Sequence, residues 1–299
     1  MCRKVLGLFG KVPSVVPQVG AGGGSGVVAG GEGGAGAGCG AGSEGRKEAR
    51  ALRVVTWNTA GGQRSAQAPG SWTSADQQAA VQGQLQRWLR AYGCDVVALQ
   101  ECESGTGAAE ILGSHELVGA VAAEESRGWV QLYVRRGLQH ERIELASGMP
   151  CVAMRVVVEA GVAEAETLVI AAVHMPVGDC AGKRLRIVEE VMKHCDERKE
   201  GVMVVGDLNA KDDEIRRLCQ DVNVLEARYA GASWGVTGNK FYAEMSYAGP
   251  GLRKDRVLFG KRVWAEAHLV GQGKVFFDDS EFFLSDHFGV LAYVDVGKV

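Results

Sequence analysis

The sequence predicts an α/β fold in which layered β-sheets are covered by helices. Two observations support this prediction. Short apolar runs rich in valine recur from residue 51 onward, as they do in buried strands. Longer segments between these runs carry apolar residues three or four positions apart, which is the spacing of amphipathic helices. With 299 residues, of which 46% are hydrophobic, the chain is long enough to bury a sizeable core.

The first half of the folded region is predicted to contain one helix among several strands. The first apolar run begins at Leu52 and is closed by Thr56-Trp57-Asn58. Residues 76–92 carry a helical apolar stripe, and Ser74 or Asp76 is the expected N-cap. Further strands, rich in β-branched and aromatic residues, are expected at 95–99, 129–134, 151–158 and 167–173.

The second half is predicted to begin with two helices separated by a strand. Residues 182–198 are expected to be helical because Leu185 and Val188 lie on one apolar face. A strand at 202–205 and a short helix at 212–219 follow. The last expected strands are 257–259, 263–267 and 288–294.

The first fifty residues differ from the rest of the chain. Residues 20–45 are dominated by glycine and alanine and show no periodicity, so they cannot bury enough surface to offset the entropy of ordering. We therefore predict a disordered tail at 1–50 and one folded domain at 51–299. Three basic residues and no acid among the first 31 positions leave an organelle transit peptide as the alternative.

Charge and cysteine usage narrow the class of protein. A net charge of −3 excludes a basic field over the whole chain, although a few local Arg and Lys side chains can still hold phosphates. The eight cysteines form no CxxC pair and no zinc-type spacing, so we interpret them as reduced thiols of an intracellular protein. The nucleus or the cytoplasm is the expected compartment. No apolar stretch approaches the length of a membrane span, and no stable membrane association is expected.

Short polar motifs stand at the ends of the predicted strands. Open α/β sheets bind ligands outside their strand ends, so motifs at several strand ends indicate one shared site. A lone Asn or Asp there more often caps a helix or closes a turn, and a lone His in an apolar run is more often a core residue. The ordered set outweighs these alternatives because independent coincidences multiply. It consists of Trp57-Asn58, Gln100-Glu101, His174, Gly206-Asp207-Leu208-Asn209 and Ser285-Asp286-His287.

The residue types in this set suit hydrolysis of a phosphoester. A hard cation held by carboxylate oxygens neutralises the anionic phosphate, and a further carboxylate orients and deprotonates the attacking water. Amides and imidazoles hold the non-bridging oxygens, where charge develops. No Ser or Cys lies in the context of a covalent nucleophile. The residues that supply these types are Asn58, Glu101, His174, Asp207, Asn209, Asp286 and His287.

Together with Lys254-Asp255-Arg256-Val257, the motifs stand in the order of the endonuclease/exonuclease/phosphatase superfamily, which the chain resembles over residues 52–296. The resemblance implies a four-layer α/β/β/α sandwich of two mixed β-sheets flanked by helices, and residues 51–299 as the catalytic domain. It also implies Mg²⁺ as the cofactor, with Mn²⁺ as a substitute. Glu101 is then the principal ligand, and Asp286 assists it directly or through water. Asn58 would lie beside the metal and contact its ligands or the substrate phosphate.

The same resemblance implies roles for the remaining site residues. Asp207 would position and deprotonate the water, and Asn209 would orient Asp207 and the phosphate. His287 would donate to a phosphate oxygen, while Asp255 steers its ring and favours its protonated form. His174 would be a second phosphate contact.

Some aromatic and basic residues near the motifs have two interpretations. Trp234, in a glycine-rich loop, is as suited to stacking on a ligand as to a core position. Asp255-Arg256 could equally be a surface ion pair that contributes little. We interpret Lys183, Arg184 and Arg186 as a solvated helix face, with phosphate binding at the helix start as the alternative.

Within the superfamily, several segments resemble the tyrosyl-DNA phosphodiesterase 2 family. They are GDLNAKDDE at 206–214, Ser233-Trp234, LRKDRVLF at 252–259 and LSDHFGVL at 284–291. This resemblance implies hydrolysis of the bond between a 5′ DNA phosphate and a tyrosine left by a stalled topoisomerase. Trp234, Arg253 and Arg256 are the substrate-binding residues expected at such DNA ends, in a protein expected to be a monomer.

Other functions are alternatives to this one. The segment Met175-Pro176-Val177-Gly178 departs from the Leu-Glu-Ser-like run of that family, so the sequence defines the reaction better than the substrate. A nuclease, a phosphoinositide phosphatase or a sphingomyelinase of the same superfamily is the first alternative. An inactive binding module is an alternative of another class, although the set of acidic, amide and imidazole residues is intact.

Overall fold

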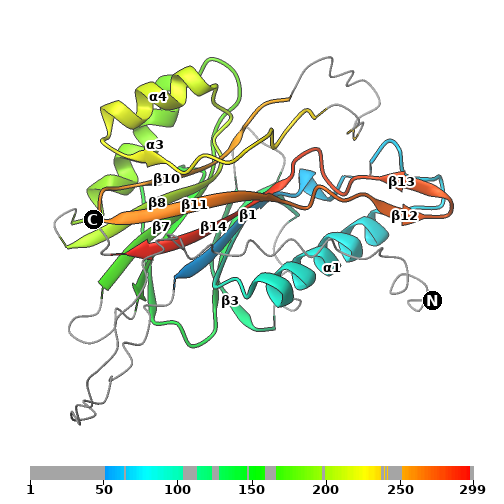
Figure 1. Ribbon diagram of the computed structural model, residues 1–299, viewed down its shortest axis with the longest axis horizontal. Coiled ribbons are helices and arrows are strands. Elements are labelled where there is room, and N and C mark those ends of the chain that lie inside the picture. Colours follow the sequence, from blue (N-terminus) through cyan, green and yellow to red (C-terminus); the bar gives the residue numbers. More distant parts are fainter. Residues whose placement is uncertain are drawn as a thin grey trace, which may run out of the picture.

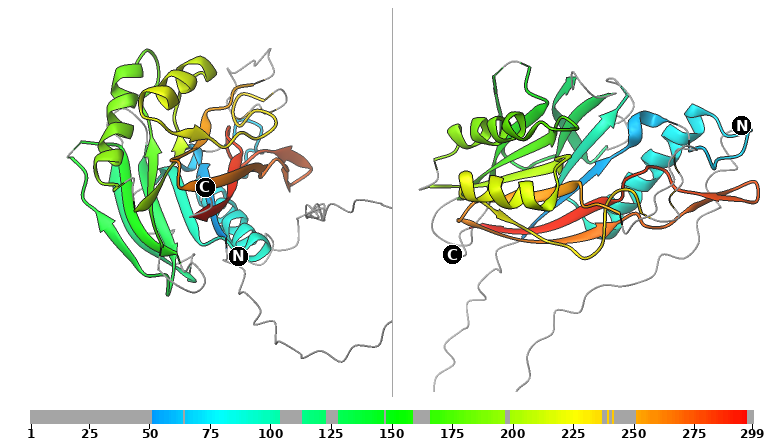
Figure 2. Two further views of the ribbon diagram at one scale, coloured as in Figure 1. Left: turned by 60° about the vertical axis from the view of Figure 1, so that its left-hand side comes forward. Right: turned by 90° about the horizontal axis from the view of Figure 1, so that it is seen from above.

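The computed structural model describes residues 51–296, except residues 64, 104–112, 123–127, 147, 159–165, 197–198, 237–238, 240 and 242–250. The predicted tail at 1–50 lies outside the described residues. Two six-stranded mixed sheets form the body of the molecule (Figure 1). Helix α1 (Ser74–Tyr92) lies on one side of them, and α3 (Ala181–Lys193) and α4 (Asp212–Asp221) lie on the other (Figure 2). The predicted four-layer sandwich is confirmed.

The first sheet contains both ends of the folded region. Its strands are β1 (Leu52–Asn58), β2 (Val96–Cys102), β3 (His115–Ala122), β4 (Trp129–Arg135), β11 (Val263–Val270) and β14 (Gly289–Val296). Their order is β11-β14-β1-β2-β4-β3. Strands β1 and β2 run parallel, and the other neighbours run antiparallel.

The second sheet is built from the middle of the chain. Its strands are β5 (His140–Ile143), β6 (Cys151–Val158), β7 (Glu166–His174), β8 (Glu200–Asp207), β9 (Leu225–Glu226) and β10 (Asp255–Phe259), in the order β5-β6-β7-β8-β10-β9. Strands β7 and β8 are its parallel pair. A separate hairpin of β12 (Val275–Phe277) and β13 (Ser280–Phe282) precedes β14, and a short 3₁₀ turn, η2 (Ala60–Gly62), follows β1.

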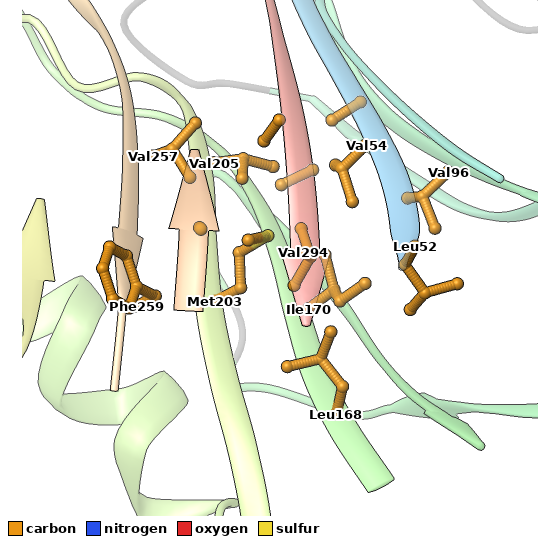
Figure 3. Close-up of a cluster of buried hydrophobic side chains, with 14 of the residues drawn as sticks. Leu52, Val54, Val96, Leu168, Ile170, Met203, Val205, Val257, Phe259 and Val294 are labelled. Atoms are coloured by element: carbon orange, nitrogen blue, oxygen red, sulfur yellow. The ribbon is translucent and has the colours of Figure 1, made fainter. Parts of the chain in front are cut away.

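Alternation along the strands divides each sheet between two cores. Successive side chains of a strand point to opposite faces. Val54 of β1 accordingly packs between the sheets, whereas the next residue, Val55, packs in the layer beneath α1. Figure 3 shows the layer between the sheets, where Val54 lies in one cluster with Ile170 of β7 and Val205 of β8. Close packing of such aliphatic side chains supplies most of the burial that holds the sheets together.

The structure shows where the predicted helices begin and end. Helix α1 begins after Thr73, whose side chain accepts from the backbone N–H of Asp76 in a capping box. The expected caps, Ser74 and Asp76, are therefore wrong, since Ser74 is the first helical residue. Helix α3 ends at Lys193, five residues before the predicted end at Arg198. Its apolar face and that of α4 pack on the outer face of the second sheet.

Several strands escaped prediction because they carry no apolar run. Strand β5 reads HERI and β9 has two residues, while β3, β12 and β13 are short or irregularly patterned. These strands lie at sheet edges or in the separate hairpin. None of the helices in the described residues is long and apolar enough to cross a membrane.

Candidate active site

The strand register brings the polar motifs to one end of the sandwich. In the first sheet, Asn58 ends β1 opposite Gln100 of β2. In the second sheet, Asp207 ends β8 with His174 of β7 on one side and Asp255 of β10 on the other. All five side chains are buried. The end of the inter-sheet layer is therefore polar although it is enclosed.

The site residues continue the inward-facing rows of the core. Because a strand repeats every two residues, Met203 and Val205 point the same way as Asp207. Met203 and Val205 belong to the cluster between the sheets. In β7, the side chains of Ile170 and His174 likewise point to the same face of the sheet. The site is thus the position where the apolar layer between the sheets gives way to carboxylates, amides and imidazoles.

Unusual backbone conformations support the two acidic motifs. Gly206 has φ 142°, and a Cβ there would lie 2.0 Å from the carbonyl oxygen of Val173, so only glycine fits before Asp207. Glu101 and Asn209 adopt left-handed φ values of 51° and 48°. Such residues persist only where their surroundings hold them. Thr59 does this for Glu101, because its Oγ1 donates to the Glu101 carbonyl oxygen at 3.0 Å.

Asn58 joins the two sheets at the centre of the site. Its Nδ2 donates to Oε1 of Glu101 (3.0 Å) and to Oδ2 of Asp207 (3.1 Å). The orientation of the amide is fixed because its Oδ1 accepts from the backbone N–H of Ala60 at 3.0 Å. One amide therefore holds a carboxylate of each sheet at a defined separation.

His287 and Asp255 form a buried pair beside this amide. Nδ1 of His287 lies 2.8 Å from Oδ2 of Asp255, which leaves Nε2 directed at Oδ2 of Asp207 (3.7 Å) and of Asp286 (3.9 Å). Burial alone would lower the pKa of His287, but these three carboxylates outweigh it and raise the pKa to about 10. The imidazole is therefore held as a cation that presents an N–H to the site.

Asp207 is an ionised carboxylate in spite of its burial. Burial acts to raise its pKa, but the imidazoles of His287 and His174 and the ammonium of Lys254 lower the pKa below its ordinary value. Its Oδ1 accepts from the backbone N–H of Asn209 at 3.0 Å. Nε2 of His174 lies 3.6 Å from Oδ2 of Asp207. A base that stays ionised and is held from several directions suits removal of a proton from water.

Glu101 is the most accessible carboxylate of the cluster, with a side chain 20% exposed. Burial and the nearby charge of Asp286 raise its pKa, since both disfavour the ionised form. Asp286 in turn accepts from Nε1 of Trp234 at 2.8 Å. A cation next to these two carboxylates would relieve both effects.

Glu101 and Asp286 offer carboxylate oxygens of the kind that hold hard divalent cations such as Mg²⁺. Among the described residues, no group of three or more His, Cys, Asp and Glu side chains is arranged to hold a metal alone. Mg²⁺ usually takes one or two carboxylates and fills its other positions with water and substrate phosphate. Glu101 with Asp286 matches that requirement.

Comparison with known proteins agrees with this geometry. A model of the endonuclease/exonuclease/phosphatase family matches residues 55–287, which is most of the chain. The chain belongs to this family. Its members are hydrolases that act on phosphoesters. The recognition of the family from its motifs is therefore confirmed, whereas no curated protein sequence matches the chain.

Solved structures of the endonuclease/exonuclease/phosphatase family share the fold at low identity. TDP2 from D. rerio, complexed with a single-strand DNA product, is 18% identical with a TM-score of 0.55, over 82% of this chain and 99% of that chain. TDP2 from C. elegans is 16% identical with a TM-score of 0.57, over 84% and 77%. A mannosyl-6-phosphatase from Bacteroides thetaiotaomicron is 13% identical with a TM-score of 0.57, over 82% and 99%.

Two of the residues expected to bind substrate, Arg253 and Arg256, lie apart from the group of carboxylates and imidazoles. Arg256 is 1% exposed, and its guanidinium binds Glu226 and Asp212. Arg253 contacts the same two carboxylates. The structure therefore does not bring either guanidinium into the group of carboxylates and imidazoles. The interpretation of Asp255-Arg256 as a surface pair is also wrong, because both residues are buried.

Trp234, in contrast, lies at the edge of the site. Its ring is half-buried, lies 6.4 Å from the ring of His287 and has the ammonium of Lys254 3.5 Å from its centroid. Lys254 thus adds a positive charge beside the site. Sequence reasoning did not assign Lys254 a role, although it stands next to Asp255 in the motif.

Two buried serines that sequence reasoning missed hold the site loops. Ser285 donates from Oγ to the carbonyl oxygen of Asn58 (2.7 Å) and accepts from the N–H of His287 (3.0 Å). Oγ of Ser233 accepts from the N–H groups of Lys254 and Asp255, each at 3.1 Å. Their adjacency to Asp286 and Trp234 in the motifs was the only signal in the sequence.

Proposed function

We propose that the chain is a Mg²⁺-dependent phosphodiesterase that hydrolyses the bond between a 5′ DNA phosphate and tyrosine. The observation that carries the reaction is the hydrogen bonding of one amide, Asn58, to both Glu101 and Asp207, beside the His287–Asp255 pair. This arrangement supplies a candidate metal ligand, a base and a protonated donor within one enclosure.

In this proposal Asp207 accepts a proton from the water that attacks phosphorus. Its ionised state and the hydrogen bond that it accepts from the Asn209 N–H suit that role. Glu101 and Asp286 would hold Mg²⁺, which when bound supplies positive charge that neutralises the phosphate and stabilises the leaving oxygen. Mn²⁺ is the expected substitute.

The imidazoles of the site act on the phosphate. His287, kept protonated by Asp255, donates from Nε2 to a non-bridging oxygen, where negative charge develops. His174 is the second phosphate contact. It lies beside Asp207 on β7, whereas Asp255 lies on the other side of Asp207, on β10. Nε2 of His174 also lies 3.6 Å from Oε1 of Glu101.

The substrate class rests on different support. The segments at 206–214, 252–259 and 284–291 resemble those of the tyrosyl-DNA phosphodiesterase 2 family, and the D. rerio structural neighbour is complexed with single-strand DNA product. Trp234 with Lys254 offers an aromatic face and a positive charge, which suit a nucleotide next to the scissile phosphate. Repair of topoisomerase–DNA adducts is the proposed role.

A second candidate is hydrolysis of a phosphomonoester on a small polar substrate. The mannosyl-6-phosphatase neighbour has the same TM-score, 0.57, as one TDP2 neighbour and favours this candidate. Phosphomonoester hydrolysis would use the same carboxylates and imidazoles, and only the groups that hold the remainder of the substrate would differ.

A panel of substrates distinguishes these candidates. The full chain would be given a 5′-phosphotyrosyl single-stranded oligonucleotide, the same oligonucleotide without tyrosine, a phosphoinositide and mannose 6-phosphate, each with Mg²⁺ and with Asp207→Asn as the blank. We expect release of a 5′-phosphate end from the tyrosyl substrate alone. Preferred turnover of another substrate would overturn the substrate assignment, and no turnover of any would overturn the proposed function.

A further inference from the structure

Arg184 is a buried cation that lies outside the reacting cluster. It is 2% exposed, and the solvated helix face expected for it is therefore wrong. Its Nη2 donates to Oε2 of Glu214 (2.8 Å) and to the carbonyl oxygen of Gly178 (3.0 Å), while Nε and Nη1 donate to Oε1 of Glu214 and to the carbonyl oxygen of Pro176. We call this set of four bonds the Arg184 clamp.

The clamp joins the two segments that leave the site strands. Pro176 and Gly178 belong to the turn that follows His174 at the end of β7. Glu214 lies in the first turn of α4, which follows Asp207 at the end of β8. A planar guanidinium that binds both oxygens of a carboxylate fixes direction as well as distance.

A second set of bonds connects the clamped segments to the reacting groups. The backbone N–H of Met175 donates to the carbonyl oxygen of Asp207 (2.8 Å). The carbonyl oxygen of Met175 accepts from Nδ2 of Asn209 (3.0 Å). Met175 lies between His174 and the clamped turn, so a shift of that turn would move the His174 and Asn209 side chains together.

We propose that Arg184, with Glu214, is a positioning residue that sets the placement of His174 relative to Asp207. This inference rests on the proposed function, because it assigns the clamp to the geometry of that reaction. Among the described residues, neither Arg184 nor Glu214 is in contact with the cluster of carboxylates and imidazoles. The clamp therefore acts through the backbone between Met175 and Gly178.

The chain contains a matched control for this pair. Arg155 donates from Nε to Oε1 of Glu200 and from Nη2 to the carbonyl oxygen of His194 (3.0 Å), so it too joins a carboxylate and a carbonyl. Glu200 lies opposite Thr167, at the end of β7 that is far from His174. Replacement of Arg155 should therefore lower stability without moving the residues of the site.

The test compares Arg184→Lys with Arg155→Lys in the full chain. A lysine cannot reach both oxygens of Glu214 and two carbonyls at once. We expect kcat for the 5′-phosphotyrosyl oligonucleotide to fall about 100-fold in Arg184→Lys with KM little changed, the loss that a displacement of about 1 Å causes. In Arg155→Lys we expect kcat to stay at the wild-type value. Glu214→Gln, which keeps the shape of the carboxylate, should show a smaller fall and serves if Arg184→Lys does not fold.

A spectroscopic readout separates positioning from general loss of stability. With histidines labelled in the ring, we expect the His174 imidazole signal to shift in Arg184→Lys and to stay in place in Arg155→Lys. Equal kcat in the two folded variants, or an unmoved His174 signal, would overturn the inference. If the wild type hydrolyses no phosphoester, the proposed function fails, and the His174 signal still decides whether the clamp positions that ring.

Discussion

The layer between the sheets and the candidate site are built from the same strands but are opposite in character. Along the inward row of β8, Met203 and Val205 pack against aliphatic side chains, and Asp207, two residues further, lies among imidazoles and amides. All three residues of this row are buried. Burial of apolar groups stabilises the fold, whereas burial of charged groups opposes it unless they are paired. The row thus changes from groups that hold the fold to groups that we propose carry out the chemistry.

This difference predicts a division of effects between the two regions. Changes in the apolar part of a row should lower stability and leave the chemistry intact, because the site is held by its own hydrogen bonds. Changes in the polar part should remove turnover and leave stability close to that of the wild type. A substitution that violates this division would show that the two regions are not separable.

The largest expected effect is that of Asp207→Asn. A neutral amide cannot take the proton from water, and a general base contributes about 10²–10⁴-fold to rate, so we expect kcat to fall by about 10³-fold. The Tm should stay within about 4 °C of the wild type, which corresponds to ~1 kcal/mol for a domain of this size. Turnover of the tyrosyl oligonucleotide and thermal unfolding, measured on the same preparation, check both parts. Undiminished turnover would remove Asp207 from its role.

The next effect is that of Ile170→Ala, in the apolar row that leads to His174. Ile170 is fully buried between the sheets. Truncation should leave a cavity and destabilise the fold by ~2–5 kcal/mol. The kcat measured well below the Tm should match the wild type. A fall in kcat comparable to that of Asp207→Asn would contradict the separation of the two regions.

A smaller effect is expected for Glu101→Gln. An amide binds a hard cation less well than a carboxylate does, so activity should need more Mg²⁺. We expect the half-saturating Mg²⁺ concentration to rise at least ~10-fold, the loss that even groups behind a ligand cause. Activity measured against Mg²⁺ concentration gives this value. Equal Mg²⁺ dependence in variant and wild type would mean that Glu101 is not the ligand.

The smallest effect concerns Asp212, which binds Arg256 and Arg253 behind the site. Its hydrogen bonds to these guanidiniums lower the pKa of the carboxyl to about 2. The stability that it contributes is therefore present above its ordinary pKa of 3.8 and is lost as the pH falls through about 2. Its side chain is 57% exposed, so the contribution should stay below ~1 kcal/mol. Urea unfolding of Asp212→Asn should be easier than that of wild type at pH 6, with the difference shrinking below pH 3; a constant difference would contradict this.

The sequence predicted what depends on local pattern. The apolar runs gave the long central strands such as β7, and the polar residue that closes each run identified Asn58, His174 and Asp207. That Asn58 of one sheet bonds to Asp207 of the other was not visible in any periodicity, because 149 positions separate the two residues. The arrangement of the two sheets was expected from the resemblance of the ordered motifs to a family.

The sequence failed where a distant partner overrides local pattern. Arg184 occupies a helical position next to other basic residues, and the groups that bind it are Glu214, 30 positions further on, and the carbonyl oxygens of Pro176 and Gly178. Helix α3 was expected to continue to Arg198. It ends earlier because the carbonyl oxygen of His194 accepts from Arg155 and the N–H of Asp196 donates to Glu200 (2.9 Å). Such pairs cannot be read from a single sequence.

In the proposed reaction, the polar end of the inter-sheet layer hydrolyses a phosphoester by attack of water on phosphorus, with Asp207 as the base. The most direct measurement is cleavage of the 5′-phosphotyrosyl oligonucleotide in ¹⁸O-labelled water, with and without Mg²⁺, by the wild type and Asp207→Asn. We predict that only the wild type with Mg²⁺ gives a 5′-phosphate end, that this end carries one oxygen from water, and that the released tyrosine carries none. Cleavage by Asp207→Asn at the wild-type rate, or the label in the tyrosine, would contradict this mechanism.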